Sequence, residues 1–164
     1  MRDVINRLYL GDDSDVPEAK KREYARLSCC KDGPDSHRSM LGYTTLGAPK
    51  DKDYYFAREG DWTALNLIDA PTPDMIPDEV IDAGLKFVHE IMTSGKKIFV
   101  HCNAGMSRSP SMVLMYLRAI GELPHGFARA EHVFKTLYPK YSPGKGMRSH
   151  ARERWYRLPD FFTK

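Results

Sequence analysis

The amino-acid sequence predicts an α/β domain in which a central, mostly parallel sheet is flanked by helices. The first reason is that short apolar runs alternate with longer segments of helical periodicity, as is typical of α/β folds. The second is the length, because 164 residues suit one domain with a core of its own. The third is the composition, with 41% hydrophobic and 29% charged residues, which excludes disordered and membrane-embedded proteins.

The N-terminal part of the chain contains short predicted elements. Residues 5–12 indicate a strand that ends in a turn, and residues 16–25 indicate a charged helix. Another strand is predicted over residues 26–30. Residues 32–60 contain several Gly and Pro residues, so this stretch is predicted to be mostly loop, and loops of such length are usually functional.

The rest of the chain is more regular. Residues 62–68 indicate a buried strand, and a proline-stiffened loop over residues 69–74 leads from it to a helix over residues 77–94. Residues 97–100 form the next predicted strand. Three further helices are predicted over residues 110–120, 126–137 and 147–158. Because strands alternate with helices, a ligand is expected outside the carboxyl ends of the parallel strands.

The segment between the strand at 97–100 and the helix at 110–120 carries the strongest chemical signal. It reads His-Cys-Asn-Ala-Gly-Met-Ser-Arg-Ser over residues 101–109. A loop of backbone N–H groups that opens onto a helix N-terminus favours an anion. A cysteine at its mouth is stabilised as a thiolate, and Arg108 offers a planar fork for two phosphate oxygens. A nucleophile, Cys102, beside a phosphate cradle predicts phosphoryl transfer through a phosphocysteine.

This segment resembles the Cys-x5-Arg active-site loop of protein tyrosine phosphatases, and the fuller string over residues 101–110 resembles the dual-specificity branch of that superfamily. The resemblance extends over residues 65–117, and residues 8–11 resemble the family's opening strand. It implies that residues 1–164 form a single phosphatase domain with a dual-specificity phosphatase-like fold. Residues 31–60 do not fit the family's spacing, so we expect an inserted or remodelled loop there, which leaves substrate choice open.

The resemblance implies a role for each position of the loop. Cys102 is the nucleophile, Arg108 binds the phosphoryl group, and the Ser109 hydroxyl hydrogen-bonds the sulfur and helps it to leave. His101 helps to fix the loop in the family, although by itself it fits a buried core histidine equally well. The phosphate is expected to be bound by Asn103, Ala104, Gly105, Met106, Ser107 and Arg108.

The mechanism also requires a carboxylic acid that protonates the leaving oxygen, because a thiolate cannot do so. Asp69 is the better candidate, since it follows the apolar strand and lies 33 residues before Cys102, close to where the family's general acid sits. Asp74 in the same loop is the rival, and either carboxylate also fits a turn or helix-capping role. No metal or cofactor is expected, because the histidines show no zinc-ligand spacing with Cys or carboxylates.

Charge indicates the class of substrate. The variable loop positions Asn103, Ala104 and Met106 are uncharged, which favours phosphorylated proteins or peptides over phosphoinositides. Phosphotyrosine is the first expectation, and phosphoserine and phosphothreonine stay open. A basic rim around the site is expected from Lys31, Arg38, Lys145 and Arg148.

Residues 135–164 hold eight Lys or Arg against two acids, within a chain of net charge +3. A solvated helix face is the favoured interpretation, and attraction of nucleic acid is the other. Two alternative functions therefore stay open, an RNA 5′-phosphatase and a non-catalytic module that only binds phosphate. A rhodanese or arsenate reductase relative is disfavoured by the upstream Asp69 and by Ser-Arg-Ser at 107–109.

Three cysteines give no disulfide framework, which together with the absence of a signal-peptide pattern at the start predicts a cytoplasmic protein. No apolar stretch approaches a transmembrane span, so no membrane insertion is expected, and a monomer is expected. Cys29 and Cys30 end a strand that should neighbour the Cys102 strand. One of them could trap oxidised Cys102 as a disulfide, but two buried small side chains are the favoured interpretation.

Overall fold

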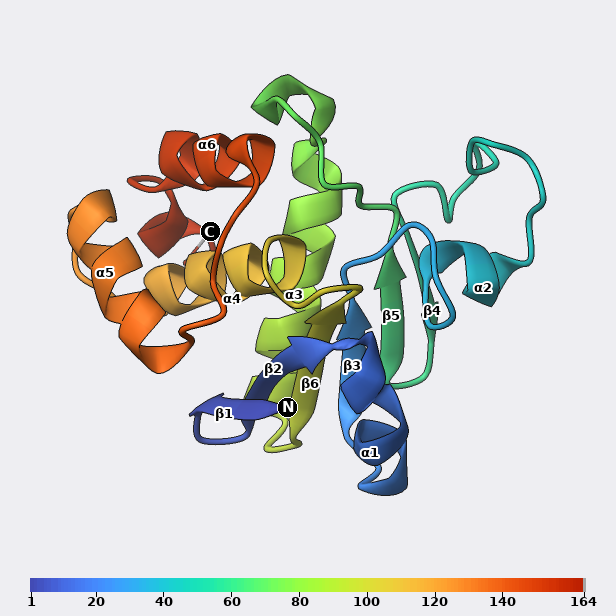
Figure 1. Cartoon of the computed structure of the whole chain (residues 1–164), viewed down its shortest axis with the longest axis horizontal. Helices are drawn as coiled ribbons and strands as arrows, with labels where there is room; N and C mark the ends of the chain where they lie inside the picture. The colour runs from blue at the N-terminus through green and yellow to red at the C-terminus, as the bar shows by residue number, and fades with distance from the viewer. Residues whose placement is uncertain (164) are drawn as a thin grey trace.

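The computed structural model describes residues 1–163 and contains a six-stranded sheet between helices (Figure 1). The strands follow one another along the sheet in the order β1, β2, β6, β3, β5, β4. Their bounds are Arg2–Ile5 (β1), Leu8–Asp12 (β2), Ala25–Ser28 (β3), Phe56–Glu59 (β4), Trp62–Leu65 (β5) and Ile98–Cys102 (β6). The four central strands run parallel, and β1 and β4 are antiparallel at the edges. The predicted α/β fold with a mostly parallel sheet is confirmed.

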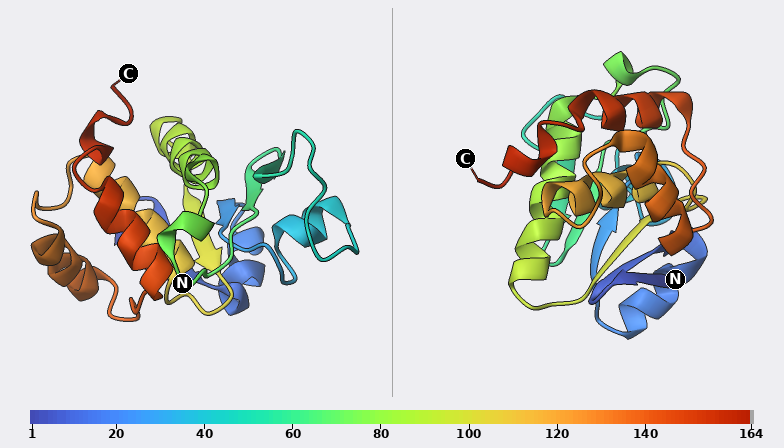
Figure 2. Two further views of the ribbon diagram at one scale, coloured as in Figure 1. Left: turned by 90° about the horizontal axis from the view of Figure 1, so that it is seen from above. Right: turned by 90° about the vertical axis from the view of Figure 1, so that its left-hand side faces the viewer.

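The helices have the bounds Val16–Lys21 (α1), His37–Leu41 (α2), Asp78–Thr93 (α3), Arg108–Ala119 (α4), Phe127–Leu137 (α5) and Lys145–Arg154 (α6). Figure 2 shows α3, α4, α5 and α6 together on one side of the sheet, with α1 on the other side. Helix α2 lies beside β4 and β5. Among the residues that the structure describes, no helix combines the length and apolar character needed to cross a membrane.

Both faces of the central strand β6 are buried. Ile98 and Val100 belong to the large apolar core that the sheet shares with α3 and α4, whereas Phe99 packs with Val16 and Ala19 under α1. Side chains alternate between the two faces of a strand, so a strand covered on both faces needs apolar residues throughout. Helix α4 is equally enclosed, because every residue from 109 to 119 is buried. The loop between β6 and α4 is therefore held at both ends by the core.

The strand order gathers the carboxyl ends of the parallel strands at one edge of the sheet. Asp12 of β2 lies beside Cys102 of β6, and Ser28 of β3 lies beside His101. The chain segments that follow β2, β3, β5 and β6 consequently meet at this edge, where ligands of such sheets bind.

Two predicted elements in the N-terminal part were wrong in extent, because strand pairing overrides local pattern. Residues 5–12, predicted as one strand, contain the end of β1, a turn and β2, and the turn holds Arg7 at a φ of 73°. The helix predicted to Ala25 ends at Lys21, because Ala25 already pairs with Ile98 in the sheet.

Residues 32–60, predicted to be mostly loop, contain the short helix α2 and the edge strand β4. Helix α2 begins after Ser36, whose hydroxyl and that of Ser39 cap the backbone reciprocally. Strand β4 pairs with β5 through a turn at Gly60, which has a φ of 59°. The long predicted helix over residues 77–94 is confirmed as α3, whereas the last one, predicted over residues 147–158, lies earlier in the chain as α6.

Candidate active site

Cys102 is the last residue of β6, and Arg108 is the first residue of α4. The five residues between them form a tight loop, and we call residues 102–109 the cradle. Only 2% of the Cys102 surface is exposed. The buried Ser109 hydroxyl donates a hydrogen bond to the Cys102 Sγ over 3.1 Å, so the first turn of α4 supports negative charge on the sulfur.

The carbonyl groups of the cradle are directed outward. Three of them accept hydrogen bonds from other parts of the chain: Asn103 from the Asp13 amide (3.4 Å), Gly105 from the Tyr138 hydroxyl (2.9 Å) and Met106 from the Ser142 amide (2.9 Å). A trans peptide points its C=O and the following N–H in opposite directions. The amides that follow, those of Ala104, Met106 and Ser107, are therefore directed to the inside of the loop, where an anion is favoured.

Gly105 is required by the shape of the cradle. Its φ of 65° lies in the left-handed region, and a Cβ atom there would stand 2.8 Å from the Gly11 carbonyl oxygen. Any side chain at this position would push the loop away from β2. Glycine at this position lets the backbone turn between Cys102 and Arg108.

Arg108 is held on two sides and left open on the third. Its Nη2 donates to the Asn103 Oδ1 over 2.6 Å, and its Nη1 donates to the Leu67 carbonyl over 3.3 Å. Among the described residues, its buried Nε has no hydrogen-bond partner. A buried charged donor without a partner is costly. An incoming anionic oxygen would supply the missing hydrogen-bond partner.

His101 is fully buried directly before the cradle and lies between two carboxylates. Its Nδ1 is 3.0 Å from the Asp13 Oδ1, and its Nε2 is 3.1 Å from the Asp35 Oδ2. Burial opposes the charged ring, but the two carboxylates outweigh it and raise the pKa of His101. In the Asp35 carboxyl, burial is likewise outweighed by His101 and Lys20, which lower its pKa to about 2. A carboxylate on each ring nitrogen thus fixes His101 at the base of the loop.

This anchor connects to Arg108. The Asp13 Oδ2 accepts a hydrogen bond of 2.8 Å from the Asn103 Nδ2, and Asn103 in turn accepts from Arg108. One continuous chain of polar contacts therefore runs from Asp35 through His101, Asp13 and Asn103 to the guanidinium. Such a chain restricts the rotamer of Arg108 before any ligand arrives.

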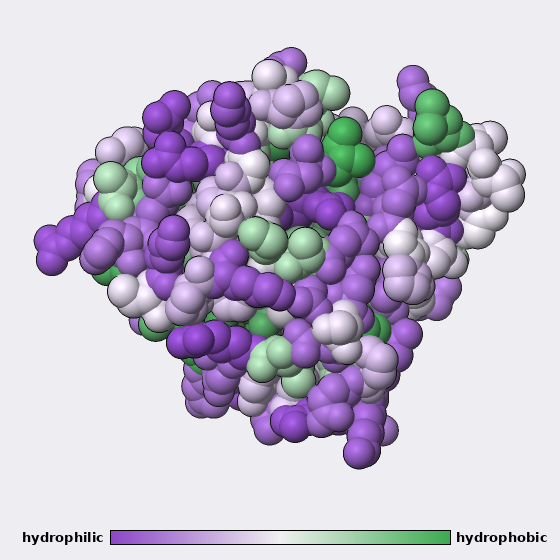
Figure 3. All heavy atoms as spheres, viewed as in Figure 1, coloured by the Kyte–Doolittle hydropathy of each residue, from purple (hydrophilic) through white to green (hydrophobic). Residues whose placement is uncertain are grey.

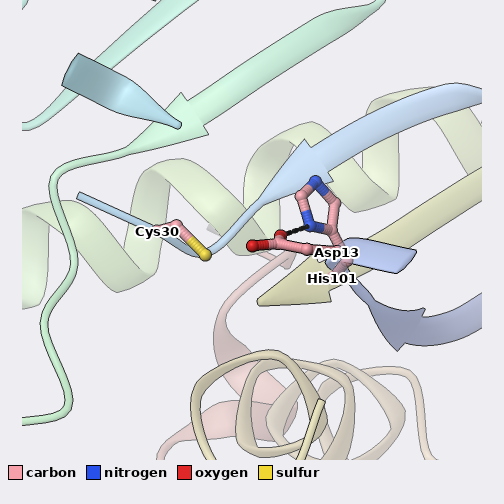
Figure 4. A group of neighbouring side chains, drawn as sticks. All are labelled: Asp13, Cys30 and His101. Atoms are coloured by element: carbon pink, nitrogen blue, oxygen red, sulfur yellow. Dashed lines mark hydrogen bonds and ion pairs between the residues drawn. The ribbon is translucent and has the colours of Figure 1, made fainter. Parts of the chain in front are cut away.

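Figure 4 shows the Asp13 carboxylate between the His101 ring and the Cys30 sulfur. The potential metal-ligand atoms of these three residues lie within 4.8 Å of one another. Both ring nitrogens already face carboxylates, and burial raises the pKa of Cys30 to about 12, so it stays a thiol. The donor set fits a hydrogen-bonded ion cluster better than a metal site. Cys29, Cys30 and Cys102 are all free.

Asp69 contacts the cradle. Its Oδ1 accepts a hydrogen bond of 2.8 Å from the Ser107 hydroxyl, which itself accepts one of 2.8 Å from the Gly144 amide. The side chain is otherwise exposed. Asp74 is also exposed and lies in the short 3-10 turn Pro73–Met75 of the same loop. Of the two candidate acids, Asp69 is the one in hydrogen-bond contact with the cradle.

The loop that carries Asp69, residues 69–74, is called the acid loop below and packs against the start of α6. A Cβ atom on Gly144 would stand 2.6 Å from the Asp69 Oδ1, and one on Gly146 would overlap the Ala70 carbonyl oxygen. Glycine at these two positions lets the helix approach the loop closely, which restricts where Asp69 can move.

Three of the four side chains expected to form a basic rim contact neighbouring groups of the protein. The Lys31 ammonium donates to the Leu46 carbonyl over 2.7 Å, Arg38 pairs with Asp32, and Arg148 pairs with Glu131. Lys145 is exposed. Farther along the basic C-terminal part, Arg154 pairs with Asp78 and Asp82. Of the four expected rim residues, Arg38 and Arg148 are thus paired with carboxylates, whereas Lys31 binds a neutral carbonyl group.

Sequence reasoning missed three contributors to the site: Asp13, Asp35 and Tyr138. Asp13 follows β2, the neighbour of the strand that ends at Cys102, so its place after a strand end was an available signal. Asp35 and Tyr138 carried no local signal. They reach the cradle only through the tertiary fold, across 66 positions for Asp35 to His101 and 33 for Tyr138 to Gly105.

Residues 63–137 match the family model described as dual specificity phosphatase, catalytic domain. The whole chain is similar to dual specificity protein phosphatase 22 of Mus musculus, with 24% identity over 154 residues, 93% of this chain and 72% of the relative. It is also similar to dual specificity protein phosphatase 15 of Mus musculus, with 28% identity over 93 residues, 57% of this chain and 39% of the relative. The match to the family model includes the strand β6, the cradle and α4.

Solved structures share the fold. A crystal structure of DUSP15 superposes with a TM-score of 0.67 at 20% identity and covers 96% of this chain and 89% of its own. A crystal structure of human DUSP28 superposes with a TM-score of 0.66 at 16% identity, and the superposition covers 95% of this chain and 96% of the DUSP28 chain. At this identity the superpositions establish the arrangement of sheet and helices.

Proposed function

Because the chain is a dual-specificity phosphatase-like member of the cysteine-dependent protein tyrosine phosphatase superfamily, we propose that it is a protein phosphatase that works through a phosphocysteine. Its substrates are phosphomonoesters in proteins, with phosphotyrosine first and phosphoserine or phosphothreonine in the same site. The observation that carries this proposal is the cradle itself. Two contacts within it support the proposal: the Ser109 hydroxyl donates to the Cys102 sulfur, and the buried Arg108 Nε has no hydrogen-bond partner among the described residues.

In the first step the Cys102 thiolate attacks phosphorus in line with the leaving oxygen. The sulfur–phosphorus bond forms as the phosphorus–oxygen bond breaks, and the protonated Asp69 gives its proton to the leaving oxygen. Arg108 and the amides inside the cradle bind the equatorial oxygens, whose charge persists through the transfer.

In the second step a water molecule attacks the phosphocysteine. Asp69, now ionised, takes a proton from the water, and the sulfur–phosphorus bond breaks. Inorganic phosphate leaves, and Asp69 is protonated again. The Ser109 hydroxyl, 3.1 Å from the sulfur, stabilises the departing thiolate by a hydrogen bond. The protein's own residues thus supply the nucleophile, the acid–base group and the oxyanion donors.

Two observations favour phosphoproteins over polyanionic lipids or RNA. The variable cradle positions Asn103, Ala104 and Met106 are uncharged. The basic side chains around the site, Lys31, Arg38 and Arg148, are bound to internal acceptors. To neutralise a substrate with several phosphates, these side chains would have to leave their present partners. We also propose that residues 1–164 act as one phosphatase domain, as a monomer in the cytoplasm, which the three free cysteines support.

The test is phosphate release from a small aryl phosphate by wild type, Cys102→Ser, Asp69→Asn and Asp74→Asn. We expect Cys102→Ser to lose more than about 1,000-fold in kcat. Asp69→Asn should lose about 100-fold or more, since a general acid contributes that much. Asp74→Asn is the matched control, an exposed carboxylate in the same loop, and should keep its activity.

Loss of activity in Asp74→Asn but not in Asp69→Asn would make Asp74 the general acid in place of Asp69. A wild type that releases no phosphate from an aryl ester would contradict the proposal. In that case, release from triphosphorylated RNA distinguishes an RNA 5′-phosphatase, and tight phosphate binding without turnover distinguishes a binding module.

A further inference from the structure

A groove of about 190 Å³ lies beside the cradle. One wall belongs to the segment that follows β5 and to the start of α3, and the other belongs to residues 47–55. Side chains that line it include Lys31, Tyr54, Tyr55, Ile68, Met75 and Val80. This volume is smaller than that of pockets for drug-sized ligands or cofactors, about 300–1,000 Å³. It suits a single side chain.

The groove and the cradle share one wall. In the segment after β5, Asn66 and Ile68 line the groove. The residues next to them contact the cradle: the Leu67 carbonyl accepts from Arg108, and the Asp69 carboxylate accepts from Ser107. Neighbouring residues of one short segment thus contact the groove and the cradle. A polypeptide bound with its phosphate in the cradle can therefore reach the groove with a residue close in sequence to the phosphorylated one.

Exposed apolar side chains gather at this place. Of the seven large hydrophobic residues exposed within residues 1–163, Met75 (50%) and Ile68 (41%) line the groove, and Met106 (42%) belongs to the cradle. Figure 3 shows apolar surface over the loop after α2 and over the segment that follows β5. Apolar residues gathered on a surface mark contact with a partner.

The segment 43–55, which includes the second wall of the groove, is held in place before a partner binds. Three side chains fix its backbone carbonyls: Lys31 binds Leu46 (2.7 Å), Arg38 binds Thr45 (2.5 Å) and Asn66 binds Tyr54 (2.8 Å). The buried His37 adds a contact of 2.7 Å to the Asp53 carbonyl. A wall that is already ordered loses little entropy on binding, so a small contact area can discriminate between partners.

We propose that this groove binds an aliphatic side chain of the phosphoprotein substrate, located within two residues of the phosphorylated one. It thereby makes the protein selective for phosphorylation sites with an aliphatic neighbour over sites with an acidic neighbour. The proposal rests on the proposed function, because it assigns the groove to the substrate whose phosphate lies in the cradle. Continuity of the shared wall and the apolar lining favour this occupant over a second copy of the chain.

The test measures kcat/KM on an aryl phosphate and on two sets of phosphotyrosine peptides. The peptides of one set carry Ile and those of the other carry Asp. In each peptide this residue stands at one position, one or two residues before or after the phosphotyrosine. The variants are Met75→Asp in the groove, Met75→Leu as its conservative partner, and Tyr156→Asp as an exposed apolar control elsewhere. Met75 is half exposed, so these substitutions spare the core.

For wild type, we expect at least one Ile position to exceed its Asp counterpart by about 10-fold or more in kcat/KM, the range for one side chain in an apolar pocket. Met75→Asp should lose this preference, while its kcat/KM on the aryl phosphate stays within about twofold of wild type. Met75→Leu and Tyr156→Asp should keep the preference.

Equal use of all peptides by a wild type that hydrolyses the aryl phosphate would overturn the groove assignment and leave the proposed function intact. So would an equal loss of both activities in Met75→Asp. A wild-type dimer that Met75→Asp dissociates, with no change in peptide preference, would assign the groove to a second copy. A wild type inactive on every ester overturns both proposals.

Discussion

The cradle and the segment 31–60 lie at the same edge of the sheet, but they are built differently. The cradle is a run of eight residues whose polar groups are tied to the core and to one another, with one buried donor of Arg108 left open. The segment 31–60 holds itself together by side-chain bonds to its own backbone and exposes apolar side chains such as Leu46. The two regions meet at the Asp32 carbonyl, which accepts from the Asn103 Nδ2, and at Asp35, whose carboxylate binds His101 directly before the cradle.

This difference separates chemistry from recognition. Changes in the cradle should reduce the turnover of every substrate, whereas changes in residues 43–55 should alter only substrates that extend beyond the phosphate. Asp35 is the exception. It lies in the segment 31–60, but its carboxylate contacts His101, the residue directly before the cradle. A segment expected to be an inserted loop therefore also supports the candidate site.

Replacing Asp35 by Asn should produce the largest effect. It removes one of two carboxylates from the buried His101, and breaking a buried ion pair costs about 3–5 kcal/mol of unfolding free energy. Urea denaturation measures the loss. Asp32→Asn, an exposed carboxylate of the same loop that pairs with Arg38, is the control and should cost less than about 1 kcal/mol.

The unfolding free energy lost in Asp35→Asn should become smaller both at low pH and at high pH. The raised pKa of His101 means that its contribution is complete below about 6.5, its unfolded value, and disappears as the pH rises through the folded value. The pKa of Asp35, lowered to about 2, means that its contribution is complete above about 4 and disappears toward pH 2. The difference between wild type and Asp35→Asn should thus be greatest between about pH 4 and 6.5. A difference independent of pH from 3 to 9 would show that the pair is not ionised.

Arg108→Lys tests whether the cradle acts on all substrates alike. Lysine keeps the charge but cannot bind Asn103 and two phosphate oxygens with one planar fork. We expect kcat/KM to fall by about 100- to 1,000-fold, the range for a lost oxyanion donor. The fall should be equal for an aryl phosphate and a phosphopeptide. Arg129→Lys on the exposed face of α5 is the control, and a loss confined to the peptide would contradict the separation of the two regions.

Gly146→Ala should have a smaller effect, because it displaces the proposed acid, Asp69, without removing it. The new methyl group overlaps the Ala70 carbonyl and forces the acid loop away from α6. We expect a loss of about 10-fold in kcat, part of the 100-fold or more that a general acid contributes. The loss should be greater for an alkyl phosphate than for a nitrophenyl phosphate, whose leaving group needs no proton. Gly126→Ala, where a Cβ meets no atom within 4 Å, is the matched control.

The parts of the molecule that sequence could predict are those with local determinants. Helix α3 was predicted within one residue at each end, because its apolar stripe recurs at helical spacing over four turns. The β1–β2 hairpin and β4 were missed, since strands of four residues owe their conformation to their neighbours in the sheet. Asp69 was predicted ahead of Asp74 as the acid, and of the two it is Asp69 that accepts a hydrogen bond from the cradle.

By itself the sequence determined the cradle, because Cys102, Gly105, Arg108 and Ser109 stand within eight consecutive residues between a buried strand and a buried helix. Local backbone geometry is enough to bring such residues around one anion. Only the tertiary structure decided what holds and flanks the cradle. Asp35, Tyr138 and the groove reach it through the order of the strands and the packing of α6, and contacts across such sequence distances leave no periodic trace in the chain.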